Sequence, residues 1–252
     1  MGQLKALIFD VDGTLAETEE YHRRAFNDAF KYFNLPWTWD RELYLELLRV
    51  TGGKERILHY QRDYLHVDEM PSEEVKAIHE YKSRRYDDYV GAGAVSLRPG
   101  VKRLIMQAMQ NGVSLGIATT TSLSNVNALL IHTLGAQSLD YFAAIAAGDM
   151  VENKKPAPDI YILALQLLGC QYNEVVAIED SRNGLLSAHG AKIATVITVS
   201  EFSINRDFEE ATAVVDHLGD EMQPSQVKSG PVSPSRFLEL EWFEQLLRDE
   251  AI

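Results

Sequence analysis

Short apolar runs alternate along the chain with longer segments in which apolar residues recur about every 3.6 positions. The short runs are typical of buried strands, and the longer segments are typical of amphipathic helices. We expect strands at residues 4–9, 113–118, 142–146, 174–178 and 193–199, with helices at residues 101–110, 123–134, 159–168 and 183–190. This alternation predicts an α/β core with a parallel sheet whose strands are buried on both faces.

One interval interrupts the alternation. About 100 residues separate the first expected strand from the second, whereas a strand–helix–strand unit needs only about 30. The interval contains helical patterns at residues 21–33, 41–49, 55–64 and 72–89, and no convincing strand. We therefore expect an inserted α-helical domain at residues 17–93, between two parts of the core at residues 1–16 and 94–222. The glycines at 91 and 93 are the expected hinge.

The last segment, residues 223–252, has a different composition. Residues 223–235 are rich in Pro and Ser and predict a linker or an ordered loop. Residues 237–247 have the pattern of an amphipathic helix, which we expect to pack on the domain or on a partner.

Composition narrows the class of protein. The 252 residues include 24 Lys and Arg against 37 Asp and Glu, a net charge of −13, which argues against a general nucleic-acid binder. Cys170 is the single cysteine, so an internal disulfide and a Cys-rich zinc site are excluded. The sequence predicts no membrane span and no signal peptide. We expect a cytoplasmic protein, with a plastid protein whose transit peptide has been removed as the alternative.

Two carboxylates stand where the first apolar strand ends. Asp10 and Asp12 are two positions apart and are followed by Gly13. Ligand sites of open α/β sheets lie at the carboxyl ends of strands, and two adjacent acids repel each other unless a cation or a proton intervenes. An Asp-Gly turn that caps a helix would also explain the pattern. A calcium loop of the EF-hand type would not, because that loop needs Gly at position six and Glu at position twelve.

Three further segments place chemistry at or beside strand ends. Thr119 follows the second expected strand, Lys155 precedes a Pro-rich helix start, and Glu179 and Asp180 close the fourth strand. Alone, each has a structural explanation: a helix cap, a solvated lysine pair and a capping acid pair. Together, the acids, the hydroxyl and the ammonium can hold Mg²⁺ and a phosphate. A chain of charge −13 needs such local positive charge to bind a phosphorylated substrate.

The order of these motifs resembles the haloacid-dehalogenase superfamily. The resemblance covers about residues 4–216: D-x-D-G-T from Asp10, then Thr119, Lys155 with its prolines, and Glu179-Asp180. It implies a Rossmann-like core with an inserted α-helical cap over the active site. The stretches at residues 17–22, 51–56 and 155–161 are similar to the branch that holds β-phosphoglucomutase and the CbbY-type sugar-bisphosphate phosphatases. The T-G-G-K-E-R stretch at residues 51–56 favours the CbbY type.

The resemblance implies a role for each core residue. Asp10 would be the nucleophile that forms an aspartyl-phosphate, and Asp12 would be the general acid and then the general base. Thr119 would donate to a phosphoryl oxygen, and Lys155 would neutralise charge and keep Asp10 ionised. Mg²⁺, the implied cofactor, would be bound by Asp10, the backbone carbonyl of Asp12, Asp180 and, directly or through water, Glu179.

The implied substrate is a small phosphorylated sugar, xylulose 1,5-bisphosphate, which is a misfire product of Rubisco in the Calvin cycle. Lys54 is the first candidate for the distal phosphate, and Arg56 and Arg85 are further candidates. Glu17 would bond sugar hydroxyls or the attacking water, and His22 would orient Asp12. Gly53 and Thr120 complete the expected substrate site. For Arg85 and His22, a place on a solvated helix surface is the alternative. The expected assembly is a monomer or a weak dimer.

Other functions either fit these residues less well or stay open. Haloacid dehalogenation and phosphonoacetaldehyde hydrolysis are disfavoured, because those branches lack an acid two positions after the nucleophile, where this chain has Asp12. A β-phosphoglucomutase-like mutase and a sugar- or phosphoglycolate-type monophosphate phosphatase stay open. An inert binding module should have lost at least one of Asp10, Asp12, Lys155 and Asp180, and this chain keeps all four.

Overall fold

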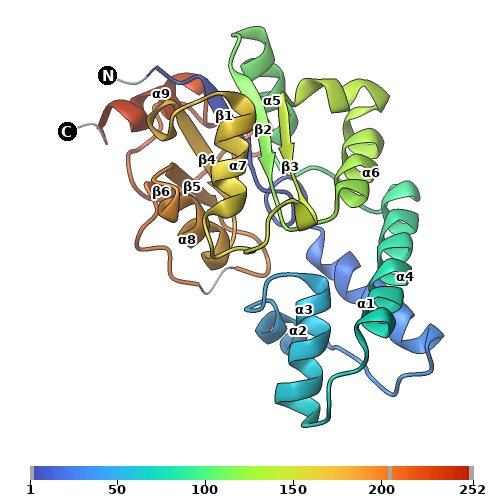
Figure 1. The fold of residues 1–252 in the computed structure, drawn as a ribbon. Helices are drawn as coiled ribbons and strands as arrows, with labels where there is room; N and C mark the ends of the chain where they lie inside the picture. The colour runs from blue at the N-terminus through green and yellow to red at the C-terminus, as the bar shows by residue number, and fades with distance from the viewer. Residues whose placement is uncertain (1–2, 204–205, 250–252) are drawn as a thin grey trace.

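A computed structural model describes residues 3–203 and 206–249 (Figure 1). Its centre is a seven-stranded sheet in the order β3-β2-β1-β4-β5-β6-β7. The strands are β1 (Ala6–Phe9), β2 (Ser114–Ala118), β3 (Ala144–Ala146), β4 (Val175–Glu179), β5 (Ala194–Thr198), β6 (Ala213–Val215) and β7 (Val227–Ser229). Strands β1 to β6 are parallel, and β7 pairs antiparallel with β6. The predicted Rossmann-like core is confirmed, with one antiparallel edge strand added.

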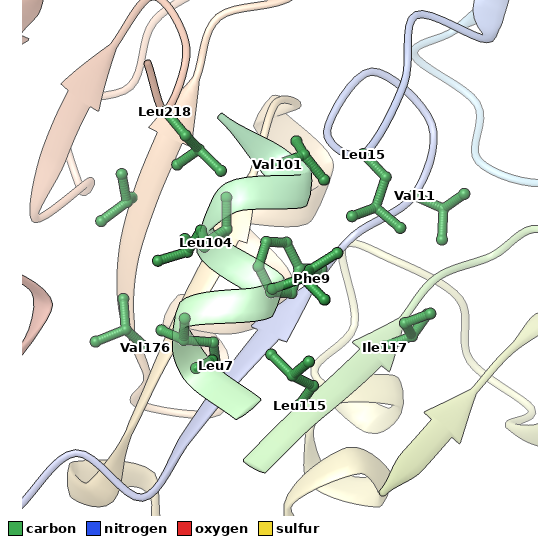
Figure 2. Packing of buried hydrophobic residues seen from close by; sticks show 14 of the residues in the cluster. Leu7, Phe9, Val11, Leu15, Val101, Leu104, Leu115, Ile117, Val176 and Leu218 are labelled. Carbon is green, nitrogen blue, oxygen red and sulfur yellow. The ribbon is translucent and has the colours of Figure 1, made fainter. Parts of the chain in front are cut away.

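Helices cover both faces of this sheet. They are α5 (Val101–Gln110), α6 (Leu123–Leu134), α7 (Asp159–Leu168), α8 (Arg182–Gly190) and α9 (Leu240–Asp249), with short 3₁₀ helices at Ala136–Tyr141, Gly148–Met150 and Tyr172–Glu174. Alternate residues of β1 point to opposite faces: Leu7 and Phe9 join the cluster under α5 and α9, and Ile8 joins the cluster under α7 and α8. Figure 2 shows the first cluster, in which side chains of β1, β2 and β4 pack around α5.

The segment between β1 and β2 forms a helical lobe beside the sheet (Figure 1). Its helices are α1 (Glu19–Tyr32), α2 (Arg41–Leu47), α3 (Gly53–His59), which continues as a π-helical turn at Tyr60–Leu65, and α4 (Ser72–Gly91). The lobe has its own buried aromatic cluster, built around Phe26, Phe30, Trp39 and Tyr44. We call residues 17–93, which contain this lobe, the cap.

The two connections between cap and core run side by side. Ala16, which leads into the cap, forms an antiparallel bridge with Leu97, which lies just after the return from the cap. The Arg98 backbone N–H donates to the Leu15 carbonyl over 2.9 Å, and the Tyr21 hydroxyl donates to the Ala94 carbonyl over 2.7 Å. The chain therefore enters and leaves the cap at one place.

The prediction for the tail is wrong in two respects. Residues 227–229 form β7 rather than part of a linker or loop. Strand β6, which lies in the core before this tail, was also not predicted, because a three-residue strand carries too little pattern to be recognised. Helix α9 begins at Leu240 and not at residue 237. Its apolar residues Trp242, Phe243 and Leu246 are buried against the core, so the helix packs on the domain itself.

Within residues 3–203 and 206–249, none of the helices combines the length and the apolar character needed to cross a membrane.

Candidate active site

The carboxyl ends of the central strands meet at a cavity of about 580 Å³ between core and cap. The register pairs Phe9 of β1 with Ile117 of β2 and with Ile178 of β4. The residue after Phe9, Asp10, therefore lies between the ends of β2 and β4, beside Glu179. Asp10, Asp12, Thr119, Lys155 and Asp180 all line the cavity.

Lys155 is the positive centre of this strand-end site. Its Nζ lies 2.7 Å from Asp10 Oδ1 and 2.5 Å from Glu179 Oε1, and it donates to the Ala118 carbonyl over 2.9 Å. Burial alone would lower the pKa of Lys155, but the charges of Asp10 and Glu179 raise it above its ordinary value. Lys155 is therefore a permanent cation, and it is held against the acid that the sequence predicts to be the nucleophile.

The site nevertheless carries more negative than positive charge. Asp10, Glu179 and Asp180 are all buried, and the Lys155 ammonium pairs with two of these three carboxylates, Asp10 and Glu179. Burial raises the pKa of Asp10 well above its ordinary value, and the charge of Glu179 adds to this effect. Burial and the charge of Asp10 raise the pKa of Asp180 in the same way. A bound divalent cation would offset the repulsion among these carboxylates and would stabilise their ionised forms.

The donor set fits Mg²⁺. One oxygen atom from each of Asp10, Glu179 and Asp180 lies within 4.8 Å of the others, and hard carboxylate oxygens are the ligands that this ion prefers. Glu179 Oε1 already accepts from Lys155 and from the Tyr161 hydroxyl, the latter over 2.8 Å. Asp10 and Asp180 are thus the residues with more oxygen atoms available for a cation.

Gly13 is required by the position of Asp180. Its φ is +83°, and a Cβ at this position would lie 2.2 Å from Asp180 Oδ2. Any larger residue would push Asp180 away from Asp10 and would also strain the backbone. The glycine of the D-x-D-G motif therefore allows the chain after β1 to lie close to Asp180 at the end of β4.

The Asp12 carboxylate is not part of this acidic cluster and is bonded by residues of both cap and core. Its Oδ1 accepts from Thr18 Oγ1 over 2.5 Å and lies 2.8 Å from His22 Nε2, and its Oδ2 accepts from the Thr121 hydroxyl. Burial alone would raise the pKa of Asp12, but His22, Thr121 and Thr18 hold it well below its ordinary value. The two aspartates of the motif therefore have opposite electrostatic environments.

His22 connects Asp12 to Lys82 of the cap. Lys82 Nζ lies 2.7 Å from His22 Nδ1, and an ammonium can only donate, so Nδ1 accepts and Nε2–H donates to Asp12. The His22 ring stacks on Tyr86 with centroids 4.0 Å apart and is 4% exposed, so a surface position for His22 is excluded. Burial lowers the pKa of Lys82 to about 8.

Thr119 does not cap helix α6. The N-cap of α6 is Ser122, whose side chain accepts from the Asn125 backbone N–H. Thr119 Oγ1 accepts from the Thr121 backbone N–H over 3.2 Å, and its own hydroxyl proton is available to a ligand. Thr119 and Thr120 both line the cavity.

The cap brings four of its predicted substrate residues to the cavity: His22, Gly53, Lys54 and Arg56. Lys54 Nζ lies 2.9 Å from Asp149 Oδ2 of the core. The Arg56 guanidinium donates to the carbonyls of Leu47 and Val50, each over 3.2 Å, so much of its hydrogen-bonding capacity is used inside the cap.

Two residues that the sequence predicts to bind the substrate do not line the cavity. Glu17 is not among the residues that line the cavity, and it pairs with Arg98 over 3.1 Å. Arg85 is also absent from the lining, and its guanidinium pairs with Asp28 over 3.1 Å and with Asp88 over 2.7 Å. Both residues lie close in sequence to residues that line the cavity, but their side chains are held by these ion-pair partners.

Sequence reasoning missed other residues that line the cavity. They include His79, Lys82, Asp149, Lys154 and Asn183. Burial, together with the charge of Lys82, lowers the pKa of His79 to about 3, so this imidazole is neutral at physiological pH. His79 and Lys82 have no motif around them, and only their i, i+3 spacing on α4 places them on one helix face.

Comparison with known proteins agrees with this geometry. The sequence profile of the haloacid dehalogenase-like hydrolases matches residues 4–192. The chain belongs to the haloacid dehalogenase-like hydrolase family. The predicted enzyme class, a haloacid-dehalogenase-type phosphatase, agrees with this membership.

Relatives within the haloacid dehalogenase-like family point to one branch. The plasmid-encoded CbbY of Cupriavidus necator is 48% identical over 225 residues, which cover 88% of each chain. A crystal structure of CbbY from Rhodobacter sphaeroides, a variant in complex with xylulose 1,5-bisphosphate, is 44% identical with a TM-score of 0.81 and covers 85% of this chain and 95% of its own. The predicted resemblance to the CbbY type is therefore confirmed.

A β-phosphoglucomutase from Clostridium difficile also matches, with a TM-score of 0.74 over 99% of both chains. Its identity is 21%, so this likeness shows the fold alone.

Proposed function

We propose that the protein is a Mg²⁺-dependent sugar-bisphosphate phosphatase that removes the C1 phosphate of xylulose 1,5-bisphosphate and so protects Rubisco. The observation that carries the proposal is the pairing of two features in one cavity: the Asp10–Lys155 centre at the strand ends and the lysines at positions 54 and 154. A substrate with a phosphate at each end matches this distribution of charge. The xylulose 1,5-bisphosphate bound to the Rhodobacter sphaeroides relative supports the choice of sugar.

The first half of the reaction transfers the phosphoryl group to the enzyme. Asp10 attacks phosphorus, a bond forms between its carboxylate oxygen and phosphorus, and the bond from phosphorus to the sugar C1 oxygen breaks. Asp12 gives a proton to the departing sugar oxygen; because its hydrogen bonds with His22, Thr18 and Thr121 favour the ionised carboxylate, it must take up that proton when the substrate binds. Thr119 donates to a phosphoryl oxygen, and Lys155 offsets the charge that builds up on the transferring group.

The second half returns the enzyme to its starting state. Asp12, now ionised, takes a proton from a water molecule as that water attacks phosphorus, and the bond between phosphorus and Asp10 breaks. The hydrogen bonds from Thr18, His22 and Thr121 keep the Asp12 carboxylate in one orientation through both proton transfers. The contact with Lys82 fixes the His22 tautomer that this orientation requires.

Asp10 and Asp180 would hold Mg²⁺, with Glu179 behind them positioning Lys155. The bound ion would supply charge neutralisation between the anionic nucleophile and the phosphate.

A variant of Lys54 should change the KM for a bisphosphate more than the KM for a monophosphate. Replacing it, Lys54→Ala, removes a charge-assisted contact to the distal phosphate, so we expect the KM for xylulose 1,5-bisphosphate to rise roughly 10- to 100-fold. The KM for a sugar 1-phosphate should rise far less. Steady-state kinetics on both substrates measures the difference, with Lys76→Ala, at an exposed cap lysine, as the matched control. Equal increases for both substrates would remove Lys54 from the distal-phosphate role.

The proposed function is tested by phosphate release from a small substrate panel, with Mg²⁺ and with EDTA. The panel holds xylulose 1,5-bisphosphate, ribulose 1,5-bisphosphate, phosphoglycolate, and β-glucose 1-phosphate with glucose 1,6-bisphosphate. We expect release that depends on magnesium and is strongest from xylulose 1,5-bisphosphate. Conversion of β-glucose 1-phosphate to glucose 6-phosphate with little free phosphate would instead identify a mutase, in which the sugar rather than water accepts the phosphoryl group.

A further inference from the structure

One carboxylate bridges a cap lysine and a core lysine at the cavity. Lys54 Nζ lies 2.9 Å from Asp149 Oδ2, and Lys154 Nζ lies 3.0 Å from Asp149 Oδ1. All three residues line the same cavity as Asp10 and Lys155. Asp149 thus pairs with both lysines, with one oxygen atom for each.

The three side chains differ in how firmly they are held. Lys154 is 14% exposed, and a second contact with Glu55 Oε1, over 2.9 Å, fixes it. Asp149 is 66% exposed, and Lys54 is 37% exposed. Exposed ion pairs contribute little to stability, so Asp149 can turn into solvent while both lysines stay at the cavity. The hydrogen bonds from Lys54 and Lys154 lower the pKa of Asp149 to about 2, so it stays an anion at neutral pH.

We infer that Asp149 is an exchange anion: the distal phosphate of the substrate displaces it from Lys54 and Lys154, and it returns when the product leaves. The inference rests on the proposed function, because it needs a substrate with a second phosphate. A phosphate carries about −1.5 to −2 charges at neutral pH against −1 for a carboxylate, so the incoming phosphate binds the two lysines more strongly. A sugar hydroxyl carries no charge and cannot displace Asp149.

The exchange would favour release of the product. Hydrolysis at C1 leaves the distal phosphate on the product, so the product keeps its contacts with Lys54 and Lys154. When that phosphate leaves, Lys54 would lose its counter-charge at the cavity, and Lys154 would keep only that of Glu55. Asp149 supplies a replacement charge within reach, and this weakens product binding relative to a site made of lysines alone.

The test is the isosteric variant Asp149→Asn, measured with three ligands. We expect the KM for xylulose 1,5-bisphosphate and the inhibition constant of xylulose 5-phosphate both to fall, by about 3- to 10-fold, because the competing anion is gone. A sugar 1-phosphate, which has no distal phosphate, should show no fall. In a Lys54→Ala background, the same change should have less effect, because one of the two lysine contacts of Asp149 is already gone.

The control is Glu201→Gln, which removes the exposed ion pair with Arg41 of the cap, 2.8 Å apart, without changing a residue that lines the cavity. It should leave all three constants unchanged. If Asp149→Asn raises the constants for all three ligands, Asp149 only ties the cap to the core, and the inference is overturned; wild-type constants also overturn it.

The wild-type enzyme separates this inference from the proposed function. A wild type that prefers the sugar 1-phosphate to the bisphosphate contradicts both. A wild type that prefers the bisphosphate, together with an unchanged Asp149→Asn variant, contradicts the inference alone.

Discussion

The variant Asp10→Asn should lose turnover by roughly 10⁴-fold or more and should keep its fold. The amide cannot attack phosphorus, so no aspartyl-phosphate forms. The fold is retained because the change adds no volume and removes one of three buried carboxylates that repel each other. Phosphate release measures the first effect, and thermal unfolding followed by circular dichroism measures the second.

A direct test of the nucleophile uses acid quenching with substrate that carries a radiolabelled C1 phosphate. Wild-type protein should retain label as an acid-stable, base-labile acyl phosphate, and Asp10→Asn should retain none. Asp140→Asn, which makes the same chemical change at an exposed position, serves as the control. Turnover near the wild-type rate in Asp10→Asn would rule out the proposed mechanism.

The variant Lys155→Met should lose both activity and stability. Removing one partner from a buried ion cluster typically costs about 3–5 kcal/mol, because the remaining charges are left unpaired. Here Asp10 and Glu179 each lose a hydrogen bond at once. Protonation of Asp10, whose pKa burial already raises, limits the loss at low pH. The stability defect should therefore grow as the pH rises above the ordinary range of an aspartate.

Urea unfolding at several pH values, with and without Mg²⁺, measures this defect. Added Mg²⁺ should recover part of the stability of Lys155→Met, since it supplies charge to the same carboxylates. Lys5→Met is the matched control: Lys5 also pairs with a glutamate, Glu174 at 2.6 Å, but lies 53% exposed at the surface, and its loss should leave unfolding nearly unchanged. If Lys155→Met unfolds like the wild type at neutral pH, Lys155 does not balance the buried acids.

The sequence predicted the strand-end residues of the site well because the fold itself brings them together. Parallel strands end at one edge, so Asp10, Thr119 and Asp180 needed only the correct strand assignment to be placed near one another. Helices α5, α6 and α7 begin and end where the periodicity predicted. Strands β6 and β7 were missed because three residues do not establish a period.

The cap side of the site was harder to predict, and the reason is geometric. Whether a cap residue faces the cavity depends on the docking of one lobe on another, which no local pattern encodes. Lys54 and Arg85 are both cationic cap residues, yet only Lys54 lines the cavity. Lys154 was not predicted to belong to the site, because the motif assigns its neighbour Lys155. Asp149 was not predicted either, because it lies in a short 3₁₀ helix without any motif.

The paired connections between core and cap have a mechanical consequence. A lobe held by two separated tethers would have to bend both independently in order to move. Here the bridge between Ala16 and Leu97 and the bond from Arg98 to Leu15 tie the two tethers to each other at the core edge. Any movement of the cap relative to the core would therefore bend both tethers at the same place, and it would have to separate the ion pairs that join cap and core, such as that of Lys54 with Asp149.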